Sequence, residues 1–355
     1  MKIAILLSKP VSRPIGGYKQ IFEYANYLSN INNVNVTIYY SGFISLVKEQ
    51  KSFIFVIWGV LRFIYFKIFG IHIKWFNFNT TIKHKYVFDH SNKYIEESNI
   101  YIATALQTSF ELAKMQKQNS FYFIQGFENW GNVTDEMVYE SYKLPLKKIV
   151  ISKGLLNKIN ALGEKAILVP NGFNCNKFYV SKEIRKRDPY CISTMYHIDS
   201  LKGFDVVQKA LDILKRKYPK LKVLCFGAYK KPSNLPEWYS YTYRATESDL
   251  HTIYNNSSIY VSASYSEGWG LTIGEAMNCG CAICCTDNDG FKMMVNNNVT
   301  GLISKCGNIT DLATNIELLI LNNALREKLA QNAIEYIKNY SIEESFSKFR
   351  NALEL

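Results

Sequence analysis

Two glutamates, Glu267 and Glu275, stand eight positions apart and bracket a stretch that is rich in glycine. An apolar run at residues 258–263 precedes them and predicts a buried strand, and the residues that follow predict a short helix ending at Gly280. The amides of such a loop and the N-terminus of such a helix form a natural anion site. A carboxylate beside a bound phosphate can accept hydrogen bonds from the hydroxyl groups of a molecule that carries the phosphate. This stretch therefore indicates a nucleotide sugar as the ligand.

A lysine, Lys202, precedes Gly203 in the loop that leads into a predicted helix over residues 205–218. An ammonium group beside a helix N-terminus can clamp a phosphate. The competing interpretation is an ordinary solvated surface lysine.

A glycine pair, Gly16 and Gly17, follows the predicted strand at residues 3–7. The pair lacks the spacing of the dinucleotide fingerprint, and no acidic residue follows the next predicted strand, at residues 34–40, so an NAD site is disfavoured. Two interpretations stay open. One is a backbone loop that approaches a ligand in a cleft, and the other is a plain tight turn.

Two groups of potential metal ligands are better explained by structure. A cysteine cluster lies in a segment, residues 281–286, that reads as a buried strand, and no second ligand pair at zinc spacing accompanies Cys279, Cys281, Cys284 and Cys285. The two carboxylates of Asp287 and Asp289 are favoured as parts of a turn that Gly290 completes. We therefore expect neither a metal ion nor a cofactor.

Strands alternate with helices along the chain, which predicts a doubly wound α/β protein. Strands in the first half are predicted at residues 3–7, 34–40, 100–104, 120–124, 148–152 and 166–170. After a polar segment that reads as a linker, residues 173–189, a second series begins with strands at residues 191–195 and 221–227. Two such domains would face one another across a cleft, the usual place for a ligand.

The composition separates several classes of partner. The length of 355 residues and a hydrophobic share of 48% fit two globular domains. The net charge of +12 is uneven: residues 1–170 hold 20 Lys and Arg against 11 Asp and Glu (+9), and residues 171–355 hold 22 against 19 (+3). No basic-aromatic recognition motif points to nucleic acid. An anionic membrane surface and a plain lysine-rich composition are the remaining interpretations.

Residues 53–76 form the most unusual segment. Residues 53–61 are wholly apolar, and Arg62, Lys67 and Lys74 then interrupt a run of aromatic and aliphatic side chains. A helix that spans a bilayer needs about 20 mostly apolar residues, which these charges prevent. A helix of the hydrophobic core is favoured, and the alternative is a helix that lies in a membrane interface.

With these residues in view, the chain resembles the family 4 glycosyltransferases of the GT-B architecture. That family carries two glutamates separated by seven residues, in a motif that here runs from Glu267 to Gly280. Weaker matches occur at Gly16-Gly17, residues 169–172, residues 202–205 and residues 286–290. The resemblance spans almost the whole chain. It implies an acceptor-binding domain over residues 1–170, completed by a closing helix at 340–355, and a nucleotide-sugar domain over residues 171–339.

The resemblance also implies site residues. Glu267 and Lys202 would be catalytic, with Glu267 on the hydroxyl groups of the transferred sugar and Lys202 on the diphosphate. Glu275 would accept hydrogen bonds from the ribose. The donor would further contact Gly268, Trp269, Gly270, Leu271, Gly16 and Gly17, mainly through backbone amides.

Two positions depart from the family pattern and leave the donor sugar open. His197 stands where many members carry an arginine, five residues before Lys202, and can still donate to a phosphate. Many members have a histidine in the loop that corresponds to residues 125–128, and here Gln125 would replace it at the acceptor.

The implied activity is a retaining, metal-independent hexosyl transfer from a nucleoside-diphosphate sugar, with UDP favoured, to a glycan or lipid-linked glycan in capsule, lipopolysaccharide or other surface-polysaccharide synthesis. A rhamnosyl or mannosyl donor is equally open. A GT-B nucleotide-sugar epimerase and a non-catalytic carbohydrate-binding protein are the alternatives. The chain begins with Met1 and Lys2 directly before a strand and shows no cleavage-site pattern, so we expect a cytoplasmic location, with contact of residues 53–76 at the inner face of the membrane as an extension.

Overall fold

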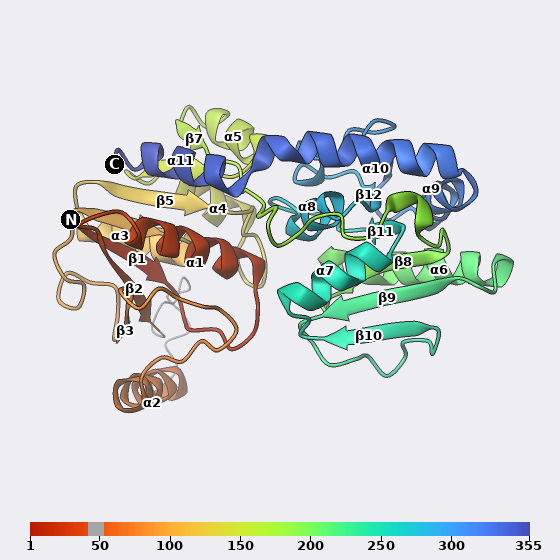
Figure 1. The fold of residues 1–355 in the computed structure, drawn as a ribbon. Coiled ribbons are helices and arrows are strands. Elements are labelled where there is room, and N and C mark those ends of the chain that lie inside the picture. The colour runs from red at the N-terminus through yellow and green to blue at the C-terminus, as the bar shows by residue number, and fades with distance from the viewer. Residues whose placement is uncertain (42–52) are drawn as a thin grey trace. The chain divides into compact units, whose positions relative to one another are not determined.

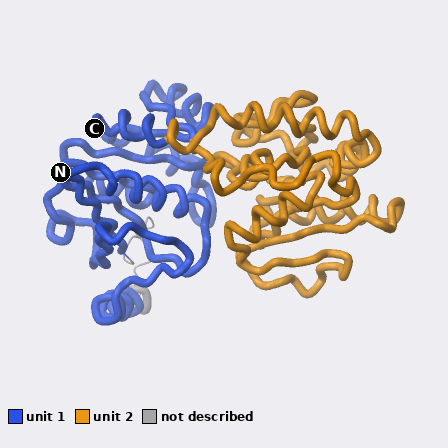
Figure 2. The backbone as a smooth tube through the Cα atoms, in the orientation of Figure 1, with its two compact units in different colours: residues 1–170, 346–355 blue, residues 171–345 orange. Residues whose placement is uncertain are grey.

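The chain folds into two compact units (Figure 2). A computed structural model describes residues 1–41 and 53–355, with the side chains of residues 53–56 outside the description. Unit 1 comprises residues 1–170 and 346–355, and unit 2 comprises residues 171–345. Each unit has its own parallel sheet, as the alternation of strands and helices predicts.

Unit 1 is built on a seven-stranded sheet in the order β3-β2-β1-β4-β5-β6-β7, with every pairing parallel (Figure 1). Its strands are β1 (Lys2–Leu7), β2 (Asn35–Ser41), β3 (Lys83–Val87), β4 (Ile100–Ala103), β5 (Ser120–Ile124), β6 (Lys147–Val150) and β7 (Ala166–Leu168). Its helices are α1 (Gly16–Ser29), α2 (Phe53–Phe69), α3 (Leu106–Met115), α4 (Asp135–Tyr142) and α5 (Lys153–Asn160). The central strands are buried on both faces, which explains their continuous apolar sequences.

The edge strand β3 is missing from the sequence-based expectation. Its sequence, residues 83–87, contains no apolar run that would predict a strand. The strand pairs only with β2, and only Val87 is fully buried. An edge strand has one sheet neighbour and less burial, so it carries a weaker hydrophobic signal.

The last helix, α11 (Ile342–Ala352), ends in unit 1. Its aromatic side chains pack on α1: Phe349 stacks on Tyr24 with ring centroids 4.0 Å apart, and Phe346 stacks on Tyr27 at 4.5 Å. The C-terminal segment therefore contributes to the hydrophobic core of unit 1.

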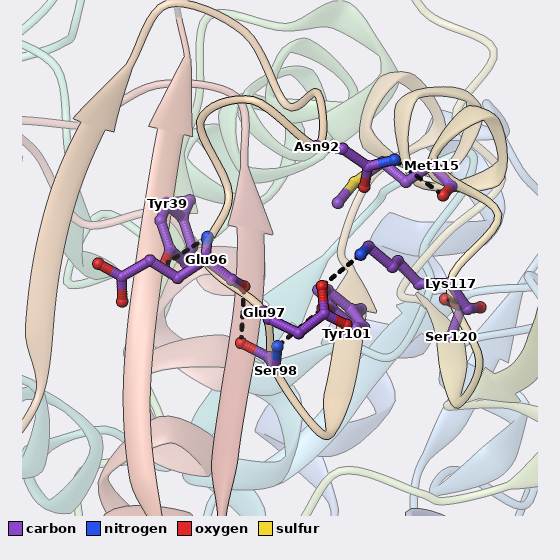
Figure 3. A network of polar contacts seen from close by, with 9 residues as sticks. All are labelled: Tyr39, Asn92, Glu96, Glu97, Ser98, Tyr101, Met115, Lys117 and Ser120. Carbon is purple, nitrogen blue, oxygen red and sulfur yellow. Dashed lines mark hydrogen bonds and ion pairs between the residues drawn. The ribbon is translucent and has the colours of Figure 1, made fainter.

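A polar network holds the segment that leads into β4 (Figure 3). The hydroxyl of Tyr101 accepts the backbone N–H of Ser98 at 2.7 Å and donates to Glu97, which also pairs with Lys117. These contacts lie at the amino end of β4, whereas ligands of doubly wound sheets bind at the carboxyl ends of the strands. The network therefore ties the segment before β4 to the sheet at the edge opposite to the expected ligand edge.

The helix α2 corrects the expectation of a core helix within residues 53–76. From Ile57 onward, most of its large side chains are exposed, including Trp58 (59%) and Ile68 (68%). The aromatic residues after the helix do pack in the core, where Trp75, Phe76 and Phe78 surround Phe22. Among the described residues, no helix is both long and apolar enough to cross a bilayer.

Unit 2 contains a six-stranded parallel sheet in the order β10-β9-β8-β11-β12-β13. Its strands are β8 (Cys191–Tyr196), β9 (Lys222–Gly227), β10 (Tyr239–Tyr243), β11 (Ile259–Ser262), β12 (Ala282–Thr286) and β13 (Leu302–Ser304). Its helices are α6 (Phe204–Lys217), α7 (Glu247–Asn256), α8 (Leu271–Asn278), α9 (Ile309–Leu321) and α10 (Asn323–Ile337). Apolar residues of α6 and α9 and of the strands form one buried cluster.

One charged residue of the polar segment 173–189 is buried in unit 2. The guanidinium of Arg187, whose pKa burial lowers, donates to the carbonyl oxygens of Tyr254, Ser257 and Cys279 at 2.6 to 3.3 Å. These carbonyls lie at the ends of α7 and α8, where the last helical turn leaves acceptors unpaired. Arg187 therefore joins the C-terminal ends of α7 and α8, and α8 is the helix that follows the predicted donor loop.

Candidate active site

The candidate site lies where the strand order of unit 2 reverses direction. The neighbouring strands β8 and β11 run parallel, and the chain leaves them toward opposite sides of the sheet. The loop after β8 carries Lys202, and the loop after β11 carries Glu267. Ligands of doubly wound sheets bind at such a reversal, outside the carboxyl ends of the strands.

Lys202 and Glu267 form an ion pair, with Lys202 Nζ 2.9 Å from Glu267 Oε1. The hydroxyl of Ser264 donates to the same carboxylate oxygen at 2.9 Å. The two charged side chains keep 28% and 16% of their surface exposed, so water screens the pair only partly. The ammonium has three protons, and the pair therefore holds Lys202 in place while leaving donor capacity for a phosphate.

Close backbone approach brings the two loops together. Gly203 has a φ of 61°, and a Cβ atom there would lie 2.0 Å from the carbonyl oxygen of Ala263. A Cβ atom at Gly290 would lie 2.5 Å from the carbonyl oxygen of Glu267. The backbone N–H of Tyr265 also donates to the Leu201 carbonyl at 2.9 Å. Gly203 therefore lets the loop after β8 approach the loop after β11, and Gly290 lets the segment after β12 approach Glu267.

The carbonyl of Ser264 anchors the glutamate loop to the segment after β12. It accepts hydrogen bonds from Thr286 Oγ1 at 2.6 Å and from Asn288 Nδ2 at 2.9 Å. Asn288 also accepts the backbone N–H of Phe291 at 3.0 Å, which closes the turn that the sequence predicts there. Sequence reasoning missed Ser264 and Asn288 because they act through a contact between two loops.

Glu275 lies on α8, which begins directly after the glycine loop. Gly270 precedes the helix with a φ of 101°, where a side chain would collide with Phe291. Glu275 is 6% exposed, and the hydroxyl of Tyr254 donates to its Oε2 atom at 3.4 Å. The helix is seated on Phe173, since a Cβ atom at Gly274 would lie 2.0 Å from that ring. The amides at the start of α8 and this carboxylate thus belong to one rigid element.

The predicted donor contacts of the loop divide into backbone and side-chain positions. The indole of Trp269 is 3% exposed and packs against Phe173 and Tyr340, with ring centroids 6.4 and 5.2 Å away. Its side chain therefore anchors the loop, and the donor contact predicted at this position would have to go through the backbone, as predicted for Gly268 and Leu271.

His197 lies in the same loop as Lys202, directly after β8. Its Nδ1 atom accepts the backbone N–H of Asp199 at 3.0 Å, and its ring meets Tyr229 edge to face at 5.0 Å. An accepting Nδ1 places the ring proton of the neutral imidazole on Nε2.

The predicted residues of unit 1 also meet at the carboxyl edge of their sheet. Gly16 and Gly17 begin α1 after β1, and Gln125 follows β5. The carboxamide of Gln125 lies against Gly17, where a Cβ atom would be 3.5 Å from Nε2. The glycine pair is therefore the start of a helix beside a polar side chain, and its approach to a ligand stays a prediction.

Sequence reasoning missed a buried carboxylate next to Gln125. Glu128 is 7% exposed, and its Oε2 atom accepts the backbone N–H of Leu106, the first residue of α3, at 2.8 Å. Burial raises the pKa of Glu128 to about 7. No local pattern marks this residue, because its partner lies in another loop.

The two potential metal-ligand groups adopt the structures that the sequence favours. Residues Cys281, Cys284 and Cys285 are free buried thiols in and beside β12, and burial raises their pKa values. Asp287 pairs with Lys292 at 2.5 Å within the turn. Over the described part of the chain, no three His, Cys, Asp or Glu side chains gather as a metal-binding group.

Comparison with known proteins relates the second half of the chain to glycosyltransferases. Residues 177–336, which contain the predicted site residues of unit 2, match the family model of glycosyl transferases group 1. An uncharacterized glycosyltransferase of Haemophilus influenzae is 26% identical over 51% of this chain and 53% of its own length. The N,N'-diacetylbacillosaminyl-diphospho-undecaprenol alpha-1,3-N-acetylgalactosaminyltransferase of Campylobacter jejuni is 27% identical over 65% of this chain and 66% of its own length. The capsular polysaccharide biosynthesis glycosyltransferase CapM of Staphylococcus aureus is 26% identical over 55% of each chain. The chain thus spans about half to two thirds of these relatives.

Solved structures establish the fold. Sucrose-phosphate synthase of Thermosynechococcus elongatus aligns with a TM-score of 0.75 at 14% identity, covering 99% of this chain and 98% of its own. HepE of Anabaena, in complex with UDP-glucose, aligns with a TM-score of 0.72 at 14% identity, covering 100% of this chain and 99% of its own. The GT-B fold, with two parallel-sheet α/β domains, is confirmed.

Proposed function

We propose that this chain is a retaining family 4 glycosyltransferase that moves a hexosyl group from a nucleoside-diphosphate sugar to a glycan or lipid-linked glycan. UDP is the favoured nucleotide. The observation that carries the proposal is the contact of Lys202 with Glu267 at the strand reversal of unit 2, beside the helix that bears Glu275. The match of residues 177–336 to a glycosyltransferase model and the names of the relatives support it.

Each donor group has a partner of suitable chemistry in this proposal. The Lys202 ammonium donates to the diphosphate while it stays paired with Glu267. Glu267, oriented by Ser264, accepts from hydroxyl groups of the sugar, and Glu275 accepts from the ribose. Backbone amides at residues 268–271 and the start of α8 face the phosphate charge. His197 Nε2 supplies a further donor in the loop after β8.

The proposed chemical step breaks the bond between the anomeric carbon and the diphosphate oxygen. The acceptor hydroxyl oxygen forms its new bond on the same face of the sugar, and its proton passes to the leaving phosphate oxygen. Lys202 and the loop amides stabilise the negative charge that develops on the diphosphate. We propose that these groups suffice without a metal ion and that no second carboxylate acts as a nucleophile.

The acceptor side of the proposal concerns unit 1. Gly16, Gly17 and Gln125 lie together at the carboxyl edge of its sheet, and the basic excess of the chain belongs to this half. Among the relatives, one name includes a diphospho-undecaprenol and another includes capsular polysaccharide biosynthesis. We therefore propose a lipid-linked acceptor in surface-polysaccharide synthesis and a cytoplasmic location.

The test is a thermal-shift and product-release screen over UDP, GDP and dTDP sugars. The matching donor should raise the melting temperature by mass action. It should also release its nucleotide slowly, because water can replace the acceptor. Both effects should persist with EDTA present, since the proposed reaction uses no metal ion. Glu267→Gln should still bind the nucleotide but should no longer release it from the donor sugar. The control Asp205→Asn, at an exposed position of α6, should change neither binding nor release. No shift with any donor would refute the proposal. Conversion of a nucleotide sugar without release would indicate an epimerase, and sugar binding without turnover would indicate a carbohydrate-binding protein.

A further inference from the structure

The helix α2 is attached to unit 1 along one narrow side. Phe66 stacks on Tyr86 of β3 at 4.6 Å, Phe63 meets Phe88 edge to face at 6.0 Å, and Gly59 is buried. These three helix positions follow one another at intervals of four and three, so they lie on one face. Figure 1 shows α2 beyond the edge of the sheet and apart from the other helices of unit 1.

The opposite side of α2 is apolar and exposed. With 3.6 residues per turn, Ile57, Leu61, Ile64 and Ile68 point directly away from the attached side, and they are 41%, 51%, 47% and 68% exposed. Three aromatic side chains next to this row are exposed to a similar degree: Trp58, Tyr65 and Phe69. A contiguous apolar surface of this kind marks an interaction site on a folded protein.

The charged residues of α2 lie between the attached side and the apolar side. Arg62 and Lys67 are exposed, and helical geometry places them on opposite flanks of the attached side. The Lys67 ammonium lies 5.4 Å from the ring of Phe63, and Arg62 is close enough to lower the pKa of Tyr86 relative to burial alone. Both cations are thus at the level where a helix embedded in an interface meets lipid headgroups.

The sequence that contains α2 is basic, although Lys85 at its end pairs with Glu96. Between Glu49 and Asp89 the sequence contains no acidic residue and six basic ones, Lys51, Arg62, Lys67, Lys74, Lys83 and Lys85. A second copy of this chain would bring Arg62 and Lys67 of both copies together, and α2 itself carries no carboxylate to compensate them. Anionic lipids, in contrast, attract such a basic surface.

We propose that α2 docks unit 1 on an anionic phospholipid bilayer, lying in the plane of the interface with its apolar side in the acyl-chain boundary. Aromatic and aliphatic side chains on one side with basic residues at the flanks are the chemistry of a helix that binds at a membrane surface. A cavity of about 360 Å³ follows the helix, is lined by nine residues between Ile71 and His84, and contributes Lys74 for a headgroup phosphate. His72 Nε2 contacts the carbonyl of Phe69 at 2.8 Å and joins this cavity to the end of α2. The inference is independent of the proposed transfer reaction.

Flotation of the full chain with vesicles tests the proposal. The protein should float with vesicles that contain phosphatidylglycerol, should float much less with pure phosphatidylcholine, and should be released in part by high salt because the charges at the surface are screened. A chain that stays below the anionic vesicles, or floats equally with both kinds, overturns the proposal.

Variants of α2 assign the binding to its apolar side. Leu61→Glu combined with Ile68→Glu should lower the vesicle-bound fraction at least about tenfold, since charges on the embedded side oppose insertion. The matched control is Leu321→Glu, a leucine that is 61% exposed at the end of α9 in unit 2, and it should float like the unchanged chain. An equal effect of both changes, or no effect of either, contradicts the proposal.

Two further measurements separate other outcomes. Sedimentation without lipid should give the same mass for the chain and the Leu61→Glu, Ile68→Glu variant, whereas a dimer that this variant splits would show an interface between copies and overturn the lipid assignment. Thermal shift with UDP should be unchanged in the variant. Loss of flotation with retained UDP binding therefore tests α2 separately from the proposed function.

Discussion

Lys202 Nζ lies 2.9 Å from Glu267 Oε1, although 64 residues separate the two positions in the chain. The pair forms because each residue lies in the loop that leaves one of two adjacent parallel strands, β8 and β11. Ser264 donates to the same glutamate oxygen, so the carboxylate is oriented before any ligand arrives. A lysine held in this way is preorganised for an anion at little additional entropic cost.

Removing the ammonium should weaken binding of a diphosphate. Lys202→Ala should raise the dissociation constant of UDP about 10- to 100-fold, which corresponds to the loss of a charge-assisted hydrogen bond of about 1.5–3 kcal/mol. The free energy of unfolding should change by only about 1 kcal/mol or less, because the pair is partly exposed. Titration calorimetry checks the first value and urea unfolding the second. The control is Lys209→Ala, which breaks an exposed pair with Asp205 on α6 and should leave UDP binding intact.

Glu275 and Lys202 should be distinguishable with uridine, which has the ribose but no phosphate. Glu275→Ala should weaken both UDP and uridine by about 10- to 100-fold, since both carry the hydroxyl groups that this carboxylate is proposed to accept from. Lys202→Ala should weaken UDP alone. Competition against a bound UDP sugar measures both ligands. Unchanged uridine affinity in the Glu275 variant would reject its ribose assignment.

Gly203 should be intolerant of any side chain. Gly203→Ala must strain a backbone with a φ of 61° and displace the Ala263 carbonyl, which would be 2.0 Å from the new Cβ atom. We expect a destabilisation of about 3 kcal/mol or more, together with loss of UDP binding. Gly163→Ala is the matched control, because its φ is 77° and its surroundings are open. That change should cost only about 1–2 kcal/mol and spare binding. Equal costs in urea unfolding would show that close packing of the two loops is unimportant.

Stability should fall as pH rises through the titration of Glu128. Burial raises the pKa of this carboxyl from its ordinary value of 4.5 to about 7, so between these values the folded chain holds a proton that the unfolded chain has released. The stabilisation from this group is complete below about pH 4.5 and is lost as pH passes 7. Integrated over this range, the effect is up to roughly 3 kcal/mol.

Glu128→Gln isolates that contribution. The amide oxygen can still accept the Leu106 N–H, but it does not titrate. The melting temperature of the variant minus that of the unchanged chain should therefore increase from pH 5 to pH 8. A difference that is constant over this range would show that Glu128 titrates normally.

Local sequence patterns account for much of the fold and for part of the site. The apolar run before Glu267, the glycines after it and the helix that ends at Gly280 form a strand, a loop and a helix, because burial and backbone freedom act over a few neighbouring residues. The buried cysteine strand and the turn at residues 287–290 followed from the same reasoning and are confirmed.

Only the tertiary structure determined which residues far apart in the sequence contact one another. The approach of Lys202 to Glu267 requires the strand order of unit 2, and the role of Glu128 requires the docking of its loop on α3. The apolar segment around α2 makes the physical reason clearest. Hydrophobicity predicts that such side chains avoid water, but only the arrangement of the other elements determines whether protein covers them. Here Phe63 and Phe66 are partly covered, while Leu61 and Ile68 are exposed.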